Sequence, residues 1–170
     1  MVGEGQVRIR VEAAGLNFRD VLNALGMVEI PWLGLELAGT VVEVGASVIG
    51  LEVGDQVFGL GEATFASSAL ADARYVIELP EGLTIKEAAT LPLAFLTAFY
   101  ALYDLADLKR HQRVLIHAAT GGVGMAAVQL AQLKGAEVFG TASAPKWSAL
   151  GELGVAEDHI ASSRELGFGE

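Results

Sequence analysis

The chain contains no cysteine among its 170 residues. This absence excludes disulfide bonds, thiolate nucleophiles and the zinc sites that combine Cys with His. Positive charge is scarce as well, because 11 Lys and Arg residues stand against 21 Asp and Glu residues, for a net charge of −10. A protein with this charge is a poor partner for nucleic-acid phosphates or for an anionic membrane surface.

Long apolar runs are also missing. The longest extends from Leu91 to Tyr103, whereas a membrane-spanning helix needs about 20 residues. The first residues show neither the basic nor the apolar region of a signal peptide. We therefore expect a soluble, cytoplasmic protein.

The first half of the chain has the pattern of short β-strands. Val7, Ile9 and Val11 alternate with charged residues, which predicts a half-buried strand. The stretch 37–57 is rich in Val and interrupted by Gly, and 73–79 predicts a further strand. Short strands joined by Gly turns favour a small barrel, because closure leaves no free sheet edges.

Helix signals appear at three places. Asn17 is placed to cap a short helix over 18–25. Thr84 and Glu87 have the spacing of a capping box at the start of another. Pro92 is expected to separate that helix from a longer one over 95–105.

From residue 109 onward strands and helices alternate. Buried strands are predicted over 113–118 and 137–142, each followed by a helix, and a third strand is expected to begin near His159. This alternation is typical of a parallel α/β sheet. The sequence thus predicts a β-rich domain with a linker helix over 1–108 and a parallel α/β domain over 109–170.

A glycine-rich turn lies between the first of these strands and its helix. It is G-x-G-x-x-G with Ala in the first position, formed by Ala119, Thr120, Gly121, Gly122, Val123 and Gly124. Small residues permit the tight turn, the close approach of a pyrophosphate and close packing of helix on strand. Because a strand precedes the turn and a helix and a second strand follow it, we interpret it as a dinucleotide site. A structural turn in an ordinary α/β domain is the alternative.

The end of the second strand bears on which dinucleotide binds. An NAD site usually has an Asp or Glu there for the ribose hydroxyls. This chain has Ser143 and Lys146 instead, and its nearest carboxylate, Glu137, lies at the opposite end of the strand. A hydroxyl and an ammonium group favour the 2′-phosphate of NADP(H). The alternative is that Lys146 is a solvated residue at a helix start.

Four segments resemble a known family. They are 15–22, which contains Asn-Phe-Arg-Asp, then 117–131 with the glycine-rich turn, 145–147, and 159–164, which reads His-Ile-Ala-Ser-Ser-Arg. They resemble the enoyl reductase domain of type I polyketide synthases, within the medium-chain dehydrogenase/reductase superfamily. The resemblance covers essentially the whole chain.

The resemblance implies an α/β plus β architecture, with a GroES-like β-barrel followed by a Rossmann-type domain. It implies NADPH-dependent hydride transfer to the β carbon of a 2-enoyl thioester on an acyl carrier protein, beside neighbouring synthase domains. Zinc alcohol dehydrogenases of the superfamily have Cys at the position of Asn17 and His at that of Leu35, so a metal-free site is implied. Reductase domains of the family are longer. We therefore expect this chain to be an N-terminal portion with an incomplete Rossmann domain, and not to be a competent reductase alone.

The resemblance also suggests site residues. Val28 stands where many members have a tyrosine; a hydrocarbon cannot donate a proton, so Val28 can only shape the pocket. Asn17 is a helix cap first and a pocket residue second. Thr97 is a candidate near the nicotinamide, and Ser163 and Arg164 are candidates near the adenosine phosphate, with packing or solvated roles as alternatives. No general acid is identified.

Two other functions stay open at this point. A quinone-oxidoreductase-like NADPH reductase shares the glycine-rich turn and needs no carrier protein. A non-catalytic cofactor-binding or scaffold portion shares the fold without turnover.

Overall fold

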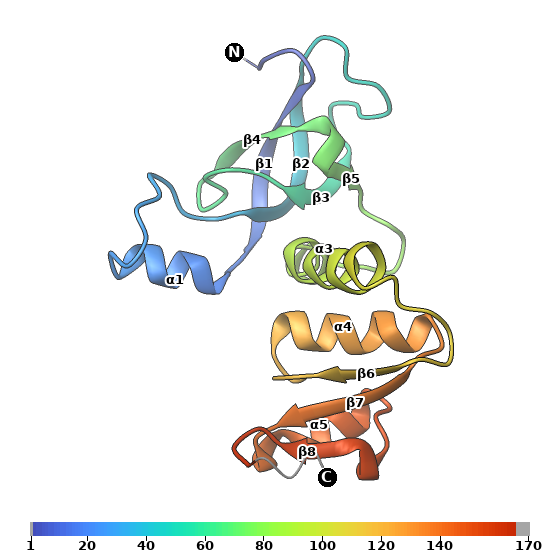
Figure 1. Ribbon diagram of the computed structural model, residues 1–170. Helices are drawn as coiled ribbons and strands as arrows, with labels where there is room; N and C mark the ends of the chain where they lie inside the picture. Colours follow the sequence, from blue (N-terminus) through green and yellow to red (C-terminus); the bar gives the residue numbers. More distant parts are fainter. Residues whose placement is uncertain (1, 166–170) are drawn as a thin grey trace. The chain divides into compact units, whose positions relative to one another are not determined.

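The computed structural model describes residues 2–165 and divides the chain into two compact units (Figure 1). The first comprises residues 1–93 and the second residues 94–170. This division falls earlier in the chain than the domain boundary expected after residue 108. No helix of the described residues is long and apolar enough to span a membrane.

The first unit is built on an antiparallel sheet. Its strands are β1 (Gln6–Gly15), β2 (Glu36–Val44), β3 (Gln56–Leu60), β4 (Ser68–Asp72) and β5 (Val76–Glu78). They lie in the order β4-β1-β2-β3-β5. The apolar positions of the alternating pattern in β1 face the core, where the fully buried side chains include Val7, Ile9, Leu37, Val41 and Val57. The predicted strand pattern of 7–11 is thereby confirmed.

The sheet must curl, because its two edge strands are consecutive in the chain. β4 and β5 are four strand spacings apart, or about 19 Å across a flat sheet. Only the turn η1 (Ala73–Tyr75), a 3₁₀ helix, connects them, and the steps from Asp72 to Val76 reach at most about 14 Å. The continuous strand predicted over 73–79 was therefore wrong in its first three residues, which form the turn that brings the edges together.

Asp72 and Arg74 stabilise this turn. The backbone N–H of Arg74 donates to Asp72 Oδ1 at 2.9 Å, and the guanidinium donates to both carboxylate oxygens at 2.6–3.2 Å. The side-chain hydrogen bonds from Arg74, with a smaller contribution from its backbone N–H, lower the pKa of Asp72 to about 2.

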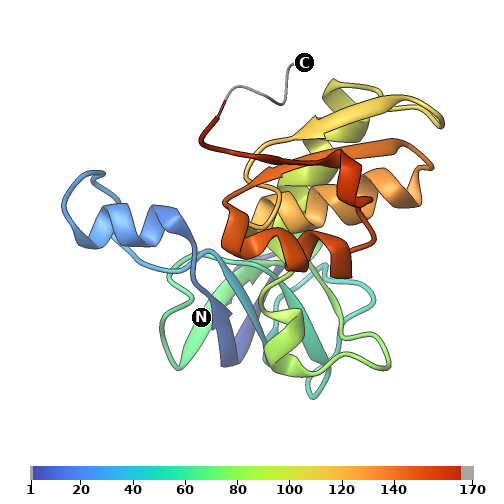
Figure 2. The same ribbon diagram turned by 90° about the horizontal axis from the view of Figure 1, so that it is seen from below.

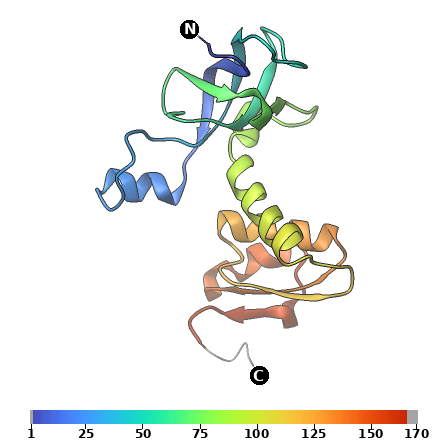
Figure 3. The ribbon, with the colours of Figure 1, turned by 45° about the horizontal axis from the view of Figure 1, so that its top comes forward.

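The helices follow the capping signals, with one correction. α1 (Phe18–Ala24) ends before Gly26, whose φ is +70°. α2 (Ile85–Ala88) begins with the predicted capping box, in which Glu87 accepts from the backbone of Thr84 at 2.9 Å. α3 (Pro92–Phe99) starts at the proline itself, since proline is favoured in the first turn of a helix. It runs on into η2 (Tyr100–Leu105), a π-helix (Figure 3), so the helix predicted over 95–105 begins too late.

The second unit contains a parallel sheet in the order β6-β7-β8 (Figure 2). Its elements are β6 (Arg113–Ile116), α4 (Gly122–Leu133), β7 (Glu137–Ala142), η3 (Ala144–Lys146), α5 (Trp147–Glu152), η4 (Glu157–His159) and β8 (Ile160–Ser162). β7 has the predicted bounds. β6 ends earlier than predicted, because Ala118 adopts a left-handed φ of +49° and belongs to the turn. α4 and α5 bury Val128 and Leu150 in one core with Ile116 and Val138.

We predict that Arg74→Met raises the pKa of Asp72 from about 2 toward its ordinary value of 3.8, without reaching it. The backbone N–H of Arg74 still donates to the carboxylate in the variant. Since the folded pKa is depressed, the stability that this carboxylate contributes is present above the unfolded value and is lost as the pH falls toward 2.

An NMR titration of the Asp72 carboxyl carbon measures the change directly. The control is Arg8→Met, which removes a donor from Glu43 instead. An unaltered Asp72 midpoint in Arg74→Met would contradict the assigned cause.

Candidate functional site

The glycine-rich turn joins β6 to α4 through a fixed set of backbone hydrogen bonds. The carbonyl of Ala118 accepts from the N–H of Gly121 at 2.8 Å. The N–H of Ala119 donates to the carbonyl of Thr141 at 2.9 Å, which ties the turn to β7. Ala119 is completely buried, so this end of the turn belongs to the core.

The glycines of the turn have unequal steric roles. A Cβ at Gly124 would lie 2.3 Å from the Ala118 oxygen and 2.8 Å from Ala119 Cα, so the helix can approach the turn only with glycine there. At Gly122 nothing lies within 4 Å of such a Cβ. Ala119 fills the first motif position, and β7 accommodates it with Gly140, whose own Cβ would lie 3.1 Å from the Ala119 methyl.

The start of α4 has the features of an anion site. The backbone N–H groups of Gly122, Val123 and Gly124 make no hydrogen bond to another residue of the described chain. They lie in the first turn of a 12-residue helix, where the helix dipole is positive. A phosphate is a ligand that suits such a group of donors.

The polar residues predicted to bind the adenosine phosphate follow two adjacent strand ends. Ala142 and Ser162 are partners in the parallel ladder of β7 and β8, and the N–H of Ser163 donates to the Ala142 carbonyl at 3.1 Å. Ser143 comes directly after β7, and its carbonyl accepts from the N–H of Lys146 at 2.8 Å. The structure therefore brings Ser143 and Ser163 to the same sheet edge.

The two cations of this group are open to solvent. The side chains of Lys146 and Arg164 are exposed and form no ion pair within residues 2–165. Thr97, the remaining predicted cofactor residue, is exposed on α3 in the second unit.

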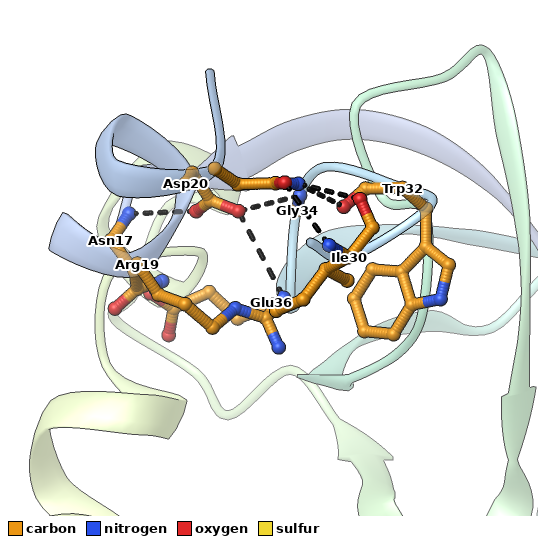
Figure 4. A network of polar contacts seen from close by, with 8 residues as sticks. Asn17, Arg19, Asp20, Ile30, Trp32, Gly34 and Glu36 are labelled. Atoms are coloured by element: carbon orange, nitrogen blue, oxygen red, sulfur yellow. Dashed lines mark hydrogen bonds and ion pairs between the residues drawn. The ribbon is translucent and has the colours of Figure 1, made fainter. Parts of the chain in front are cut away.

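The other predicted site residues, Asn17 and Val28, lie in the first unit. Asn17 contacts two carboxylates that the sequence analysis did not single out. Asp20 and Glu36 are 2% and 3% exposed. Asp20 accepts from the backbone N–H of Asn17 at 3.0 Å and from that of Gly34 at 2.9 Å (Figure 4). Arg19 lies beside Asp20, with Nη2 at 3.9 Å from Oδ1, and stacks on Trp32 at 4.7 Å.

Glu36 is the first residue of β2 and accepts two hydrogen bonds. Its Oε1 accepts from Asn17 Nδ2, and its Oε2 accepts from the backbone N–H of Leu93, each at 2.8 Å. A Cβ at Gly15 would lie 2.3 Å from Oε1, so glycine makes room for the carboxylate. An acidic residue directly before the apolar stretch Leu37-Ala38-Gly39 was the available sequence signal.

Val28 is half-buried in the segment that follows α1. Asn23 shapes the next part of this loop. Its Nδ2 donates to the carbonyls of Ile30 and Trp32 at 2.9 and 3.0 Å, and its Oδ1 accepts from the Ile30 N–H.

Within the described part of the chain, no three His, Cys, Asp or Glu residues form a group that could hold a metal ion.

Comparison with known proteins shows where this combination of features occurs. Residues 3–81 match the family described as alcohol dehydrogenase GroES-like domain. Over 168 residues the chain is 56% identical to the pikromycin polyketide synthase component PikAII of Streptomyces venezuelae, covering 98% of this chain and 4% of that protein. The crystal structure of CurK enoyl reductase has a TM-score of 0.93 and 46% identity over 99% of this chain. The chain thus has an alcohol dehydrogenase GroES-like domain over residues 3–81 and is similar over nearly its whole length to enoyl reductases of the medium-chain dehydrogenase/reductase superfamily.

A third relative was solved with a bound cofactor. The mycobacterial protein Rv1454c, solved in complex with NADPH, has a TM-score of 0.85 and 33% identity over 95% of this chain and 52% of its own. The present chain spans 54% of the CurK enoyl reductase chain. The chain thus spans about half the length of these two solved relatives.

We predict that Gly124→Ala lowers the free energy of unfolding of this chain by about 1–3 kcal/mol, because the added methyl meets backbone atoms that cannot give way. Gly122→Ala is the matched control. It adds the same methyl in the same helix turn into open space, so its stability should be unchanged or slightly higher.

Thermal and urea unfolding of both variants measure this difference. Equal losses of stability in the two variants would contradict the close approach of α4 to the turn.

Proposed function

We propose that the chain is part of an NADPH-dependent enoyl reductase of a polyketide synthase. The enzyme reduces a 2-enoyl thioester carried on an acyl carrier protein. The observation that carries this proposal is the 56% identity to a polyketide synthase component over 98% of the chain. Its 46% identity to a solved enoyl reductase supports the same reaction class. Neighbouring synthase domains and the carrier protein are the proposed partners.

The residues of the second unit fit a nicotinamide dinucleotide. The amides of Gly122, Val123 and Gly124 would hold the pyrophosphate. Lys146 and Ser143 would hold the 2′-phosphate, with Ser163 and Arg164 at the neighbouring strand end. The absence of an acidic side chain from 141–146 supports NADPH over NADH, because a carboxylate would repel that phosphate. Thr97 is proposed to lie near the nicotinamide.

NADPH supplies a hydride for the β carbon of the enoyl group when it is bound. The residues of this chain contribute binding and shape. Asn17 and Val28 are proposed to line the substrate pocket, where the Val28 side chain limits the space and cannot transfer a proton. Developing negative charge on the thioester oxygen needs donors near it, and none of the residues named here is assigned to that role or to protonation of the α carbon. The reaction is proposed to proceed without zinc.

We predict that Lys146→Glu weakens NADPH binding about tenfold and leaves NADH binding nearly unchanged. The reason is that an ammonium–phosphate contact is replaced by repulsion between like charges. Lys86→Glu, on α2 of the first unit, changes charge equally and serves as the control. Fluorescence titrations with both nucleotides at two salt concentrations provide the measurement. Equal weakening for NADH and NADPH would contradict a contact between Lys146 and the 2′-phosphate, and unchanged binding of both would assign Lys146 a solvated role.

A second experiment separates the enzyme classes. We expect the chain to oxidise NADPH when a crotonyl thioester is added or, if there is no turnover, to bind the thioester saturably. We expect neither result with benzoquinone. Preference for the quinone would replace the proposed function with a quinone reductase. Nucleotide binding without any response to either substrate would favour a cofactor-binding portion.

A further inference from the structure

The carbonyl oxygen of Ala142, the last residue of β7, accepts two hydrogen bonds. The backbone N–H of Ser163, directly after β8, donates to it at 3.1 Å. The indole Nε1–H of Trp147, the first residue of α5, donates to the same oxygen at 3.1 Å. A carbonyl oxygen has two lone pairs and can satisfy both donors. One atom therefore connects the ends of two strands with the start of a helix.

The indole of Trp147 ties the turn between β7 and α5 to the sheet. The backbone N–H of Lys146 donates to the carbonyl of Ser143 at 2.8 Å, and the backbone N–H of Trp147 also bonds within this turn. Of the side chains at 143–147, all within the described part of the chain, that of Trp147 alone forms a hydrogen bond to the strand. Leu150 is completely buried and anchors the body of α5. The indole anchors the residues just before it.

We propose that Trp147 is a positioning residue for NADPH selectivity. Its indole N–H holds the turn where Ser143 and Lys146 converge with Ser163 on one phosphate. The proposal rests on the proposed function, which assigns these three residues to the 2′-phosphate. Lys146 is exposed and has no ion pair within residues 2–165 to order it, so the turn must place it. A binding group that is placed before the ligand arrives loses less entropy on binding.

Trp147→Phe removes this link with little other change. The tryptophan is 38% exposed, so most of its ring is covered by the chain, and phenylalanine keeps an aromatic ring there. Only the N–H donor is lost. The Ala142 carbonyl retains the backbone N–H of Ser163 in the variant, so no acceptor is left unsatisfied and the fold should persist.

The probes are adenosine 2′,5′-bisphosphate and adenosine 5′-monophosphate, which differ only in the 2′-phosphate. We expect the wild-type chain to bind the bisphosphate more tightly. Trp147→Phe should reduce this preference about three- to tenfold, as the loss of one positioning hydrogen bond allows, while its affinity for the monophosphate changes little. Calorimetric titration measures both affinities and requires neither turnover nor an enoyl substrate.

Two controls separate positioning from general damage. Trp32→Phe changes the other of the two tryptophans, whose ring packs on Arg19 in the first unit. Leu150→Val weakens the core beneath α5 and leaves the indole hydrogen bond in place. Both variants should retain the full preference for the bisphosphate.

The outcomes distinguish the positioning role from the cofactor assignment. A preference retained in Trp147→Phe, or lost equally in Leu150→Val, overturns the positioning role and leaves the NADPH assignment standing. Equal binding of the two nucleotides by the wild-type chain, or binding of neither, overturns the 2′-phosphate site and with it the proposed preference for NADPH.

The carbonyl ¹³C NMR signal of Ala142 tests the shared acceptor without any ligand. Each hydrogen bond to a carbonyl withdraws electron density from its carbon and moves the signal downfield. Loss of the indole donor should therefore move the Ala142 signal upfield in Trp147→Phe and leave it unchanged in Trp32→Phe. An unmoved signal in Trp147→Phe overturns the proposal.

Discussion

A buried carboxylate, that of Glu36, sets the arrangement of the polar residues in the first unit. Burying an ionised group without partners is costly, so the chain around it must supply donors and room. Asn17 and Leu93 supply the donors from the start of α1 and the start of α3. Gly15 supplies the room, since any side chain there would meet the carboxylate. Two segments far apart in the sequence, residues 15–17 and the start of α3, thus depend on one side chain.

Asp20, the second buried carboxylate, likewise connects two segments, the start of α1 and the loop that leads into β2. It accepts from the backbone of Asn17 and from that of Gly34, so it holds the first turn of α1 against the chain just before Glu36. Arg19 places its charge near this carboxylate and its flat face on Trp32. The segment Asn-Phe-Arg-Asp that carries the family resemblance is therefore a structural unit, in which each polar member contacts a different part of the fold.

The second unit shows how a departure from a motif is accommodated. Ala119 replaces the first glycine of the dinucleotide motif, and its methyl group would crowd a side chain on β7. Gly140 occupies that position of β7 and removes the conflict. The third glycine, Gly124, has no such freedom, because its neighbours are backbone atoms of the turn. The spacing of the motif is preserved while one of its residues is exchanged.

Local signals predicted much of this protein well. The bounds of β7, the capping box of α2 and the glycine after α1 depend on neighbouring residues, and the sequence alone determined them. Other features were decided by the tertiary structure. Residues 73–75 have strand-like composition but form a turn, because the edges of the sheet must meet there. Asn17 has the position of a helix cap, yet its side chain donates to a carboxylate 19 residues away. No local pattern contains that information, because the partner of a buried polar group is determined by which segments the folded chain brings together.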